Sequence, residues 1–174
     1  MTQPVTATPV RLDRNAVEHA ARTATGAILS LQVARLFGLP ESYWAAVTTI
    51  IVLQSTLGAA LSVSALRFVG TAMGAAAGAL VATRFASSVL VFGAAVFMLG
   101  VLSAALHLDR SAFRFAGITL AIVMLAVSGQ SPWVVAAHRF VEVSIGIVIA
   151  LLLTAVWHER GRAGMSAAEH KTMP

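Results

Sequence analysis

The sequence contains no cysteine and only seven acidic residues among its 174 residues. Without cysteine the chain can form no disulfide and has no thiol nucleophile. Charged residues make up 11% of the chain, whereas a soluble domain carries roughly 25%. A surface with so few charges is poorly suited to water. The scarcity of charge therefore disfavours both a disordered chain and a water-soluble globular domain.

Hydrophobic residues make up 58% of the chain, and long uncharged runs separate the few charges. A helix needs about 20 apolar residues to cross a membrane core of about 30 Å. The runs predict an all-α polytopic membrane protein with a turn between its second and third spans near Leu57–Ser62. The six predicted transmembrane helices cover residues 17–38, 42–58, 61–83, 86–106, 111–129 and 133–157.

The charge pattern also predicts the organisation of the chain in the bilayer. We expect a flexible polar arm at 1–15, a transmembrane domain at 16–158 and a polar tail at 159–174. With the N-terminus in the cytoplasm, nine basic residues lie on the inner side and three on the outer side. This bias predicts a multi-pass protein of the cell inner membrane with both termini cytoplasmic. The arginines are spread over several loops, which disfavours nucleic acid as a partner.

Small residues form a stripe along the third predicted span. Gly70, Gly74 and Gly78 follow one another at a spacing of four, and Arg67 lies one turn before them. Such a stripe lets another helix approach closely, either within the chain or from a second copy. We favour this packing role, and a role in lining a substrate path stays open as the alternative.

A short motif recurs in the sixth span. Arg67-Phe68-Val69 followed by Gly74 matches Arg139-Phe140-Val141 followed by Gly146. The recurrence comes three spans later, where a repeat of three helices would place it. A three-helix repeat enters the membrane from the opposite side, so the motif suggests a 3+3 inverted repeat.

The sixth span also carries charges inside an apolar run. His138, Arg139 and Glu142 share one helical face, and a charge at the bilayer centre costs about 2.5–3.5 kcal/mol on insertion scales. Two interpretations stay open. Arg139 and Glu142 form a self-satisfied pair near the outer interface, or Arg139 attracts an anion while Glu142 relays a proton.

Polar residues in the first two spans allow two interpretations as well. Arg22 follows Glu18 by four residues and either extends its charge to the inner interface or lines an aqueous path. Gln54 and Thr56, near the end of the second span, are suited to hydrogen bonds with a ligand or with another helix.

Motifs of enzymes are missing from the sequence. It contains no HExxH, no G-x-S-G, no GxGD and no nucleotide-binding GxxxxGK[ST]. Its five histidines are scattered without metal-ligand spacing. We therefore predict a protein that is not an enzyme and that uses neither a metal nor a cofactor.

Four motifs in this order and spacing carry a family resemblance. They are Tyr43–Thr48, Val52–Ala59, Arg67–Gly74 and the set Arg139, Glu142 and Gly146. Together they resemble the membrane half of the fusaric acid resistance family, which groups aromatic acid exporters with the aluminium-activated malate channels of plants. The resemblance covers roughly residues 22–157. Ser55 departs from the pattern, because the family usually has proline there.

The resemblance implies a half-unit that pairs with a second copy, most simply as a homodimer, and that moves organic anions. We therefore predict an efflux-type transporter or channel for organic carboxylates, with aromatic carboxylates as a candidate class. A non-transporting subunit of a membrane assembly is the alternative. In the transport hypothesis the arginines attract the anion, two polar residues bind it, and the glutamate tunes Arg139 or couples transport to protons. The expected pathway residues are Arg22, Gln54, Thr56, Arg67, Arg139 and Glu142.

Overall fold

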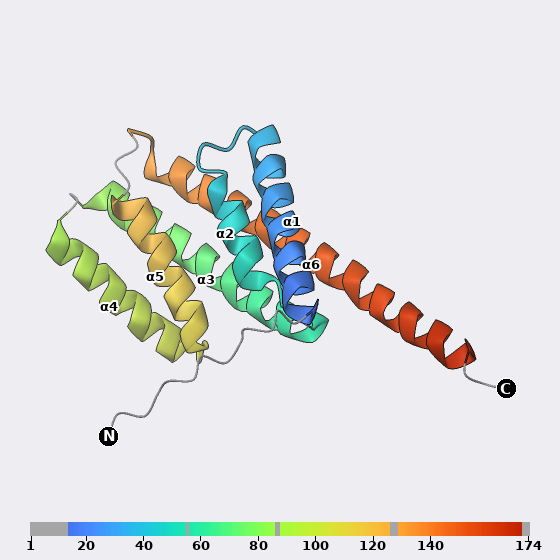
Figure 1. Ribbon diagram of the computed structural model, residues 1–174. Coiled ribbons are helices and arrows are strands. Elements are labelled where there is room, and N and C mark those ends of the chain that lie inside the picture. The colour runs from blue at the N-terminus through green and yellow to red at the C-terminus, as the bar shows by residue number, and fades with distance from the viewer. Residues whose placement is uncertain (1–13, 55, 86–87, 126–128, 172–174) are drawn as a thin grey trace, which may run out of the picture.

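The computed structural model describes residues 14–54, 56–85, 88–125 and 129–171, and these residues form helices without any strand (Figure 1). The helices are α1 (Arg14–Leu36), α2 (Tyr43–Val52), α3 (Leu57–Arg84), α4 (Val89–Ala105), α5 (Arg110–Leu125) and α6 (Pro132–Lys171). The all-α prediction is therefore confirmed. Residues 1–13 of the expected N-terminal arm lie outside the described residues.

The break between α2 and α3 comes earlier than the sequence predicted. Helix α2 ends at Val52, Leu53 is extended and α3 already begins at Leu57, so the break comes before the predicted turn at Leu57–Ser62. The hydroxyl of Thr56 accepts a hydrogen bond from the Ala59 amide at 3.3 Å and so caps α3. A threonine in this position satisfies one of the free amides of a helix start, which favours starting the helix there. Ser55 lies outside the described residues.

Among the described residues, two helices are long and apolar enough to cross a membrane by length and composition, namely α3 and the Pro132–Trp157 part of α6. Helices α2 and α4 are apolar but shorter. The count of six spans therefore stays a prediction. Helix α6 continues to Lys171, beyond the predicted end of the sixth span at residue 157. The predicted domain boundaries remain untested.

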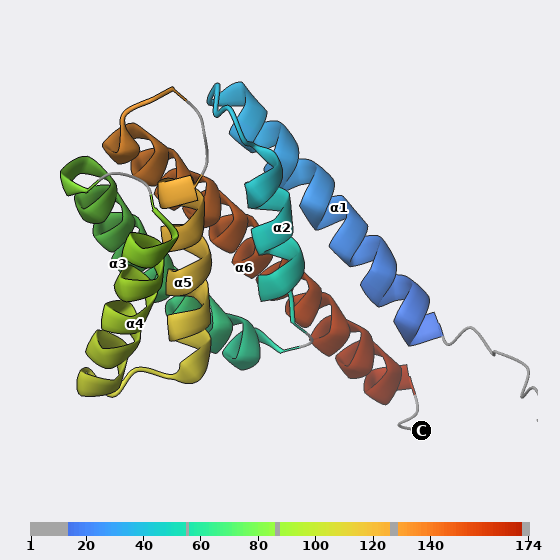
Figure 2. The ribbon, with the colours of Figure 1, turned by 90° about the vertical axis from the view of Figure 1, so that its left-hand side faces the viewer.

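Helix α6 lies at the centre of the fold. Figure 2 shows α1 and α2 on one side of it and α3, α4 and α5 on the other. Helix α3 packs against both α5 and α6, α2 packs against α6, and α4 packs mainly against α5. One core cluster joins the end of α2 to the middle of α6 through Val52, Leu53, Val143 and Ile147.

Glycines allow two of these helix pairs to approach closely. A Cβ atom added to Gly74 would lie 2.8 Å from the carbonyl carbon of Ala116 on α5. A Cβ atom on Gly70 would lie 2.9 Å from the Cβ atom of Phe115, also on α5. A Cβ atom on Gly78 would lie 3.0 Å from the Cβ atom of Val123, again on α5. The glycine stripe of α3 thus packs against α5 of the same chain.

Gly146 has the same relation to α2. An added Cβ atom would lie 2.6 Å from the Cβ atom of Thr48. The hydroxyl of Thr49 also donates a hydrogen bond to the Gly146 carbonyl at 3.1 Å. This contact holds α2 tightly on α6 and places Thr48 in the middle of the protein.

Candidate functional site

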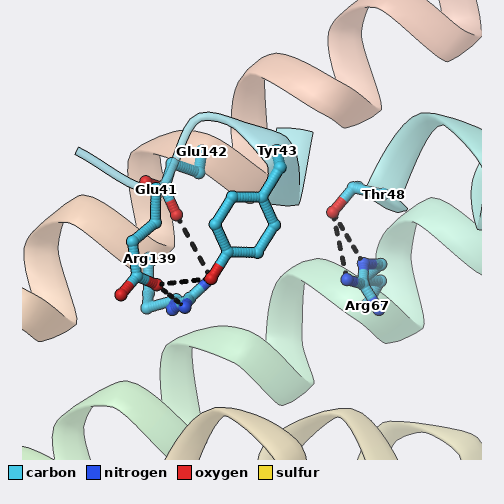
Figure 3. A network of polar contacts seen from close by, with 6 residues as sticks. All are labelled: Glu41, Tyr43, Thr48, Arg67, Arg139 and Glu142. Carbon is cyan, nitrogen blue, oxygen red and sulfur yellow. Dashed lines mark hydrogen bonds and ion pairs between the residues drawn. The ribbon is translucent and has the colours of Figure 1, made fainter. Parts of the chain in front are cut away.

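Arg139 is the centre of a buried ionic cluster at the start of α6. Its guanidinium forms an ion pair with Glu41, which precedes α2, and lies 3.3 Å from a carboxylate oxygen of Glu142 (Figure 3). The guanidinium also stacks on Trp44, at 4.2 Å from the ring centre. Arg139 and Glu142 are 4% and 1% exposed, whereas the side chain of Glu41 is 35% exposed. Of the two carboxylates, only that of Glu41 is therefore open to solvent.

Arg67 lies on α3 and has neutral partners. Its Nε and one terminal nitrogen donate hydrogen bonds to the Thr48 hydroxyl at 3.1 and 3.0 Å (Figure 3). Its guanidinium lies 4.8 Å from the ring centre of Phe115. The side chain is 4% exposed. A threonine and an aromatic ring orient this cation, and among the residues that the structure describes no carboxylate forms an ion pair with it.

Arg67 and Arg139 lie close enough for their positive charges to repel each other. The two residues that follow them also meet, since the rings of Phe68 and Phe140 are 4.9 Å apart between centres. The fold therefore brings together three of the residues predicted from the sequence, Arg67, Arg139 and Glu142, from two helices.

Arg22 belongs to a second cluster. Its guanidinium donates hydrogen bonds to the Thr154 hydroxyl at 2.7 Å and to the Gln54 backbone carbonyl at 3.1 Å. Thr154 and Arg139 are 15 residues apart on α6, which corresponds to about 22 Å along a helix. The structure thus divides the predicted pathway residues between two positions along α6. Arg22 is buried, which argues against a side chain that only extends to the interface.

Gln54 and Thr56 lie at the break between α2 and α3. The side-chain amide of Gln54 donates to the Ile51 carbonyl at 3.1 Å, and Thr56 caps α3. Both side chains therefore stabilise the ends of helices in this structure. Arg22 is bound by the backbone of Gln54 rather than by its side chain.

Four residues of these clusters were not among the predicted site residues. They are Glu41, Trp44, Thr48 and Thr154, each of which contacts one of the arginines. Trp44 and Thr48 belong to the family motif Tyr43–Thr48, which carries no sign of a contact with an arginine. Glu41 stands two residues before the aromatic pair Tyr43-Trp44 at the start of the second span, and this position is the one available signal.

Two cavities adjoin the Arg139 cluster. A polar pocket of about 60 Å³ is lined by Glu41, His138, Arg139 and Glu142, among others. One oxygen of Glu142 and Nδ1 of His138 are buried without a hydrogen-bond partner. A groove of about 350 Å³ runs between α2 and α5 and also reaches Glu41 and Arg139. Within the described residues, no group of three histidine or acidic residues is arranged to hold a metal.

Comparisons with known proteins agree with the motifs. The model of the fusaric acid resistance protein family matches residues 16–172. The inner membrane protein YeeA of Escherichia coli strain K12 is 30% identical to the chain over 152 residues. The match covers 83% of this chain and 42% of the relative, so the chain spans less than half of the relative's length. No solved structure matches the chain.

These matches confirm the resemblance that the motifs suggested. The location of the relative supports a place in a membrane, and the family is one of membrane proteins of the transporter type. The family match covers the helices that carry Arg22, Arg67 and Arg139. The chain belongs to the fusaric acid resistance protein family.

Proposed function

We propose that the protein is an efflux-type transporter or channel for organic carboxylate anions in the inner membrane. The single observation that carries this proposal is the environment of Arg67. Its guanidinium is buried in the centre of the protein, and its hydrogen-bond partner is the neutral hydroxyl of Thr48. The charge of Arg139 also acts on it, and that charge is positive as well.

A buried cation without a counterion is costly. Removing an ion of this size from water costs several kcal/mol even after the protein relaxes, because the low dielectric supports its charge poorly. An anion entering beside Arg67 would recover part of that cost. A carboxylate also matches the planar fork of a guanidinium, with which it can form two parallel hydrogen bonds.

We further propose that the six helices all span the membrane as a 3+3 inverted repeat. Helix pairing supports the repeat. In such a repeat α1 corresponds to α4, α2 to α5 and α3 to α6. Within the described residues, whenever two helices pack together, the two helices that correspond to them also pack together. The pairs α2–α6 and α3–α5 correspond in this way, and the pair α3–α6 corresponds to itself.

Residue contacts support the same repeat. Arg139 stacks on Trp44 of α2, and its counterpart Arg67 lies over Phe115 of α5. The sequences after these two aromatics also correspond, because Ala45 to Thr48 and Ala116 to Thr119 both begin with alanine and end with threonine.

The pair Phe68 and Phe140 would mark the axis of the repeat. These residues are equivalent in the two copies of the motif, and their rings touch. A residue meets its own counterpart only close to a twofold axis. Transporters with inverted repeats bind their substrates near such an axis, which is where Arg67 lies in this proposal.

Further parts of the proposal come from the family and from the charge bias. We propose a homodimer with both termini in the cytoplasm, as the resemblance and the positive-inside bias suggest. The Arg22 cluster, with Gln54 and Thr56 nearby, would form a second anion position along α6. Glu142 would hold Arg139 in place and tune its charge.

The test is uptake of radiolabelled benzoate into proteoliposomes that contain the purified full chain. We expect Arg67→Gln to reduce the initial rate at least tenfold, since the counterion for the anion is lost. Arg84→Gln is the matched control, because Arg84 lies exposed at the end of the same helix. Arg67→Lys, which keeps the charge, should retain more flux than Arg67→Gln.

The non-transporting assembly subunit gives a different result. In that case the wild-type protein passes no benzoate, and Arg67→Gln changes only the melting temperature of the purified protein. Equal rates for wild type, Arg67→Gln and Arg84→Gln, with all three correctly folded, would exclude the role proposed for Arg67.

A further inference from the structure

The groove between α2 and α5 has an apolar wall and a charged end. Trp44 of α2 and Ile122 of α5 line its wall, and Arg139 and Glu41 form its end. Its volume of about 350 Å³ is within the range of small-molecule sites, which is about 300–1,000 Å³. An apolar wall with a single cation at one end is suited to a ligand with an apolar body and one carboxylate.

Arg139 is held rigidly at this end of the groove. The ring of Trp44 supports one face of its guanidinium, and Glu142, one turn along the same helix, binds one terminal nitrogen. Both Arg139 and Glu142 are almost fully buried. This arrangement fixes the direction in which the other terminal nitrogen can bind an anion.

Glu41 occupies that remaining position. Its carboxylate accepts a hydrogen bond from the second terminal nitrogen of Arg139 and a long one of 3.4 Å from the Tyr43 hydroxyl. Glu41 follows Gly38, which has a φ of +68°, and Pro40 in the segment between α1 and α2. Its side chain is about one third exposed, so it is the partner of Arg139 that can leave without opening the core.

The charges at this end of the groove do not leave room for another anion. Two carboxylates, Glu41 and Glu142, face the single guanidinium of Arg139. Each of them occupies one terminal nitrogen of that guanidinium, so a third carboxylate would find both nitrogens already bound. An anion can therefore bind Arg139 only after Glu41 has moved away.

We propose that Glu41 is a tethered competitor for a carboxylate-binding site in this groove. In the closed state its carboxylate takes the position on Arg139 that the carboxylate of a ligand takes in the open state. The apolar body of the ligand then lies against Trp44 and Ile122. This inference rests on the proposed anion transport and adds a specific site and a control element to it.

The experiment measures the half-saturating concentration of benzoate for flux in proteoliposomes. Glu41→Gln should lower it about tenfold or more, which corresponds to the loss of one competing hydrogen bond to a charged group. Glu41→Ala should act in the same direction, and Glu41→Asp should stay close to the wild type. Asp109→Asn is the matched control, since it removes one exposed acidic charge before the start of α5, whereas the groove adjoins the end of that helix.

A second pair of measurements tests the groove itself. Ile122→Ala should raise the half-saturating concentration of benzoate, because it removes apolar surface from the wall. The same substitution should leave the value for acetate unchanged, since acetate has no apolar body to place there. Equal changes for the two anions would contradict binding in this groove.

The outcomes separate this inference from the proposed function. If the wild type transports benzoate and both Glu41→Gln and Glu41→Ala keep the wild-type half-saturating concentration, the tethered competitor is wrong while anion transport stands. If the wild type shows no benzoate flux and Glu41→Gln transports benzoate, the competitor role is supported directly. If the wild type, Glu41→Gln and Glu41→Ala all show no benzoate flux, the proposed function fails and this inference fails with it.

Discussion

The contact between α3 and α5 gives a sharp prediction about stability. Gly74 has no side chain, and an added Cβ atom would lie 2.8 Å from the carbonyl carbon of Ala116, with the carbonyl oxygen closer still. Ordinary van der Waals contact begins at 3.4 Å, so Gly74→Ala must separate the helices by at least about 0.6 Å. The obstacle is backbone in the middle of a helix, which cannot rotate away.

The magnitude follows from the packing that this separation loosens. A gap of about 0.5–1 Å already forfeits a quarter to a half of the dispersion energy of each contact across it. Overpacking of a tight interior typically costs about 1–3 kcal/mol. Helices in a membrane associate largely through such close packing of small residues, because the lipid tails are as apolar as the side chains and supply no hydrophobic driving force. The packing that is lost here is therefore not offset by another term. We expect Gly74→Ala to destabilise the protein by about 1–3 kcal/mol.

Gly117→Ala is the matched control, because Gly117 lies on α5 beside Ala116 and an added Cβ atom there meets nothing within 4 Å. That substitution should be neutral or stabilise the protein by up to about 1 kcal/mol through helix propensity. The assay is unfolding by denaturant in detergent micelles, followed by circular dichroism. Equal stability of Gly74→Ala and Gly117→Ala would refute the backbone contact between α3 and α5.

Two further predictions concern single hydrogen bonds. Thr154→Val should destabilise the protein by about 1–3 kcal/mol in the same assay, because the buried Arg22 loses a hydrogen-bond partner at 2.7 Å. Thr83→Val is the control and should have little effect, since the Thr83 hydroxyl donates hydrogen bonds to backbone carbonyls of its own helix α3. The hydrogen bond from the Ser111 amide, at 2.7 Å, lowers the pKa of the exposed Asp109 carboxylate in the segment before α5. Because the pKa of Asp109 is lowered in the folded state, its carboxylate stabilises the folded protein at pH values above the unfolded pKa of about 3.9. This stabilisation is lost as the pH falls through the folded pKa. The melting temperature of Asp109→Ser should therefore fall less than that of the wild type between pH 5 and about pH 3, and parallel curves would contradict this assignment.

The sequence predicted the features that depend on local spacing. The order of the helices follows from the lengths of the uncharged runs, and the close contacts of Gly70 and Gly74 follow from small residues at a spacing of four. The contact of Arg139 with Glu142 likewise follows from their separation of three residues on one helix. Each of these features is decided within a few turns of the chain.

The partners that complete the site could not be predicted in this way. Glu41 and Arg139 are 98 residues apart in the chain, and Arg22 and Thr154 are 132 apart. Which residues meet at such separations depends on which helices pack together, and the charge pattern does not contain that information. The end of α2 was misplaced for a local reason, because the capping hydroxyl of Thr56 competes with the apolar run that continues through Leu57.

The two central arginines differ in one respect that bears on how an anion would pass. Both are buried over an aromatic ring, Arg139 on Trp44 and Arg67 on Phe115, and the proposed repeat makes these positions equivalent. Their polar partners differ in charge, since Arg139 faces two carboxylates and Arg67 faces the neutral hydroxyl of Thr48. A cation that attracts an anion and a cation that is already neutralised then lie side by side. The difference arises from Glu41, in a connecting segment, and from Glu142, whose counterpart position on α3 is Gly70. Control of anion entry would therefore depend on two acidic side chains added to a symmetric helical frame, and of these only Glu41 can move without disturbing the core.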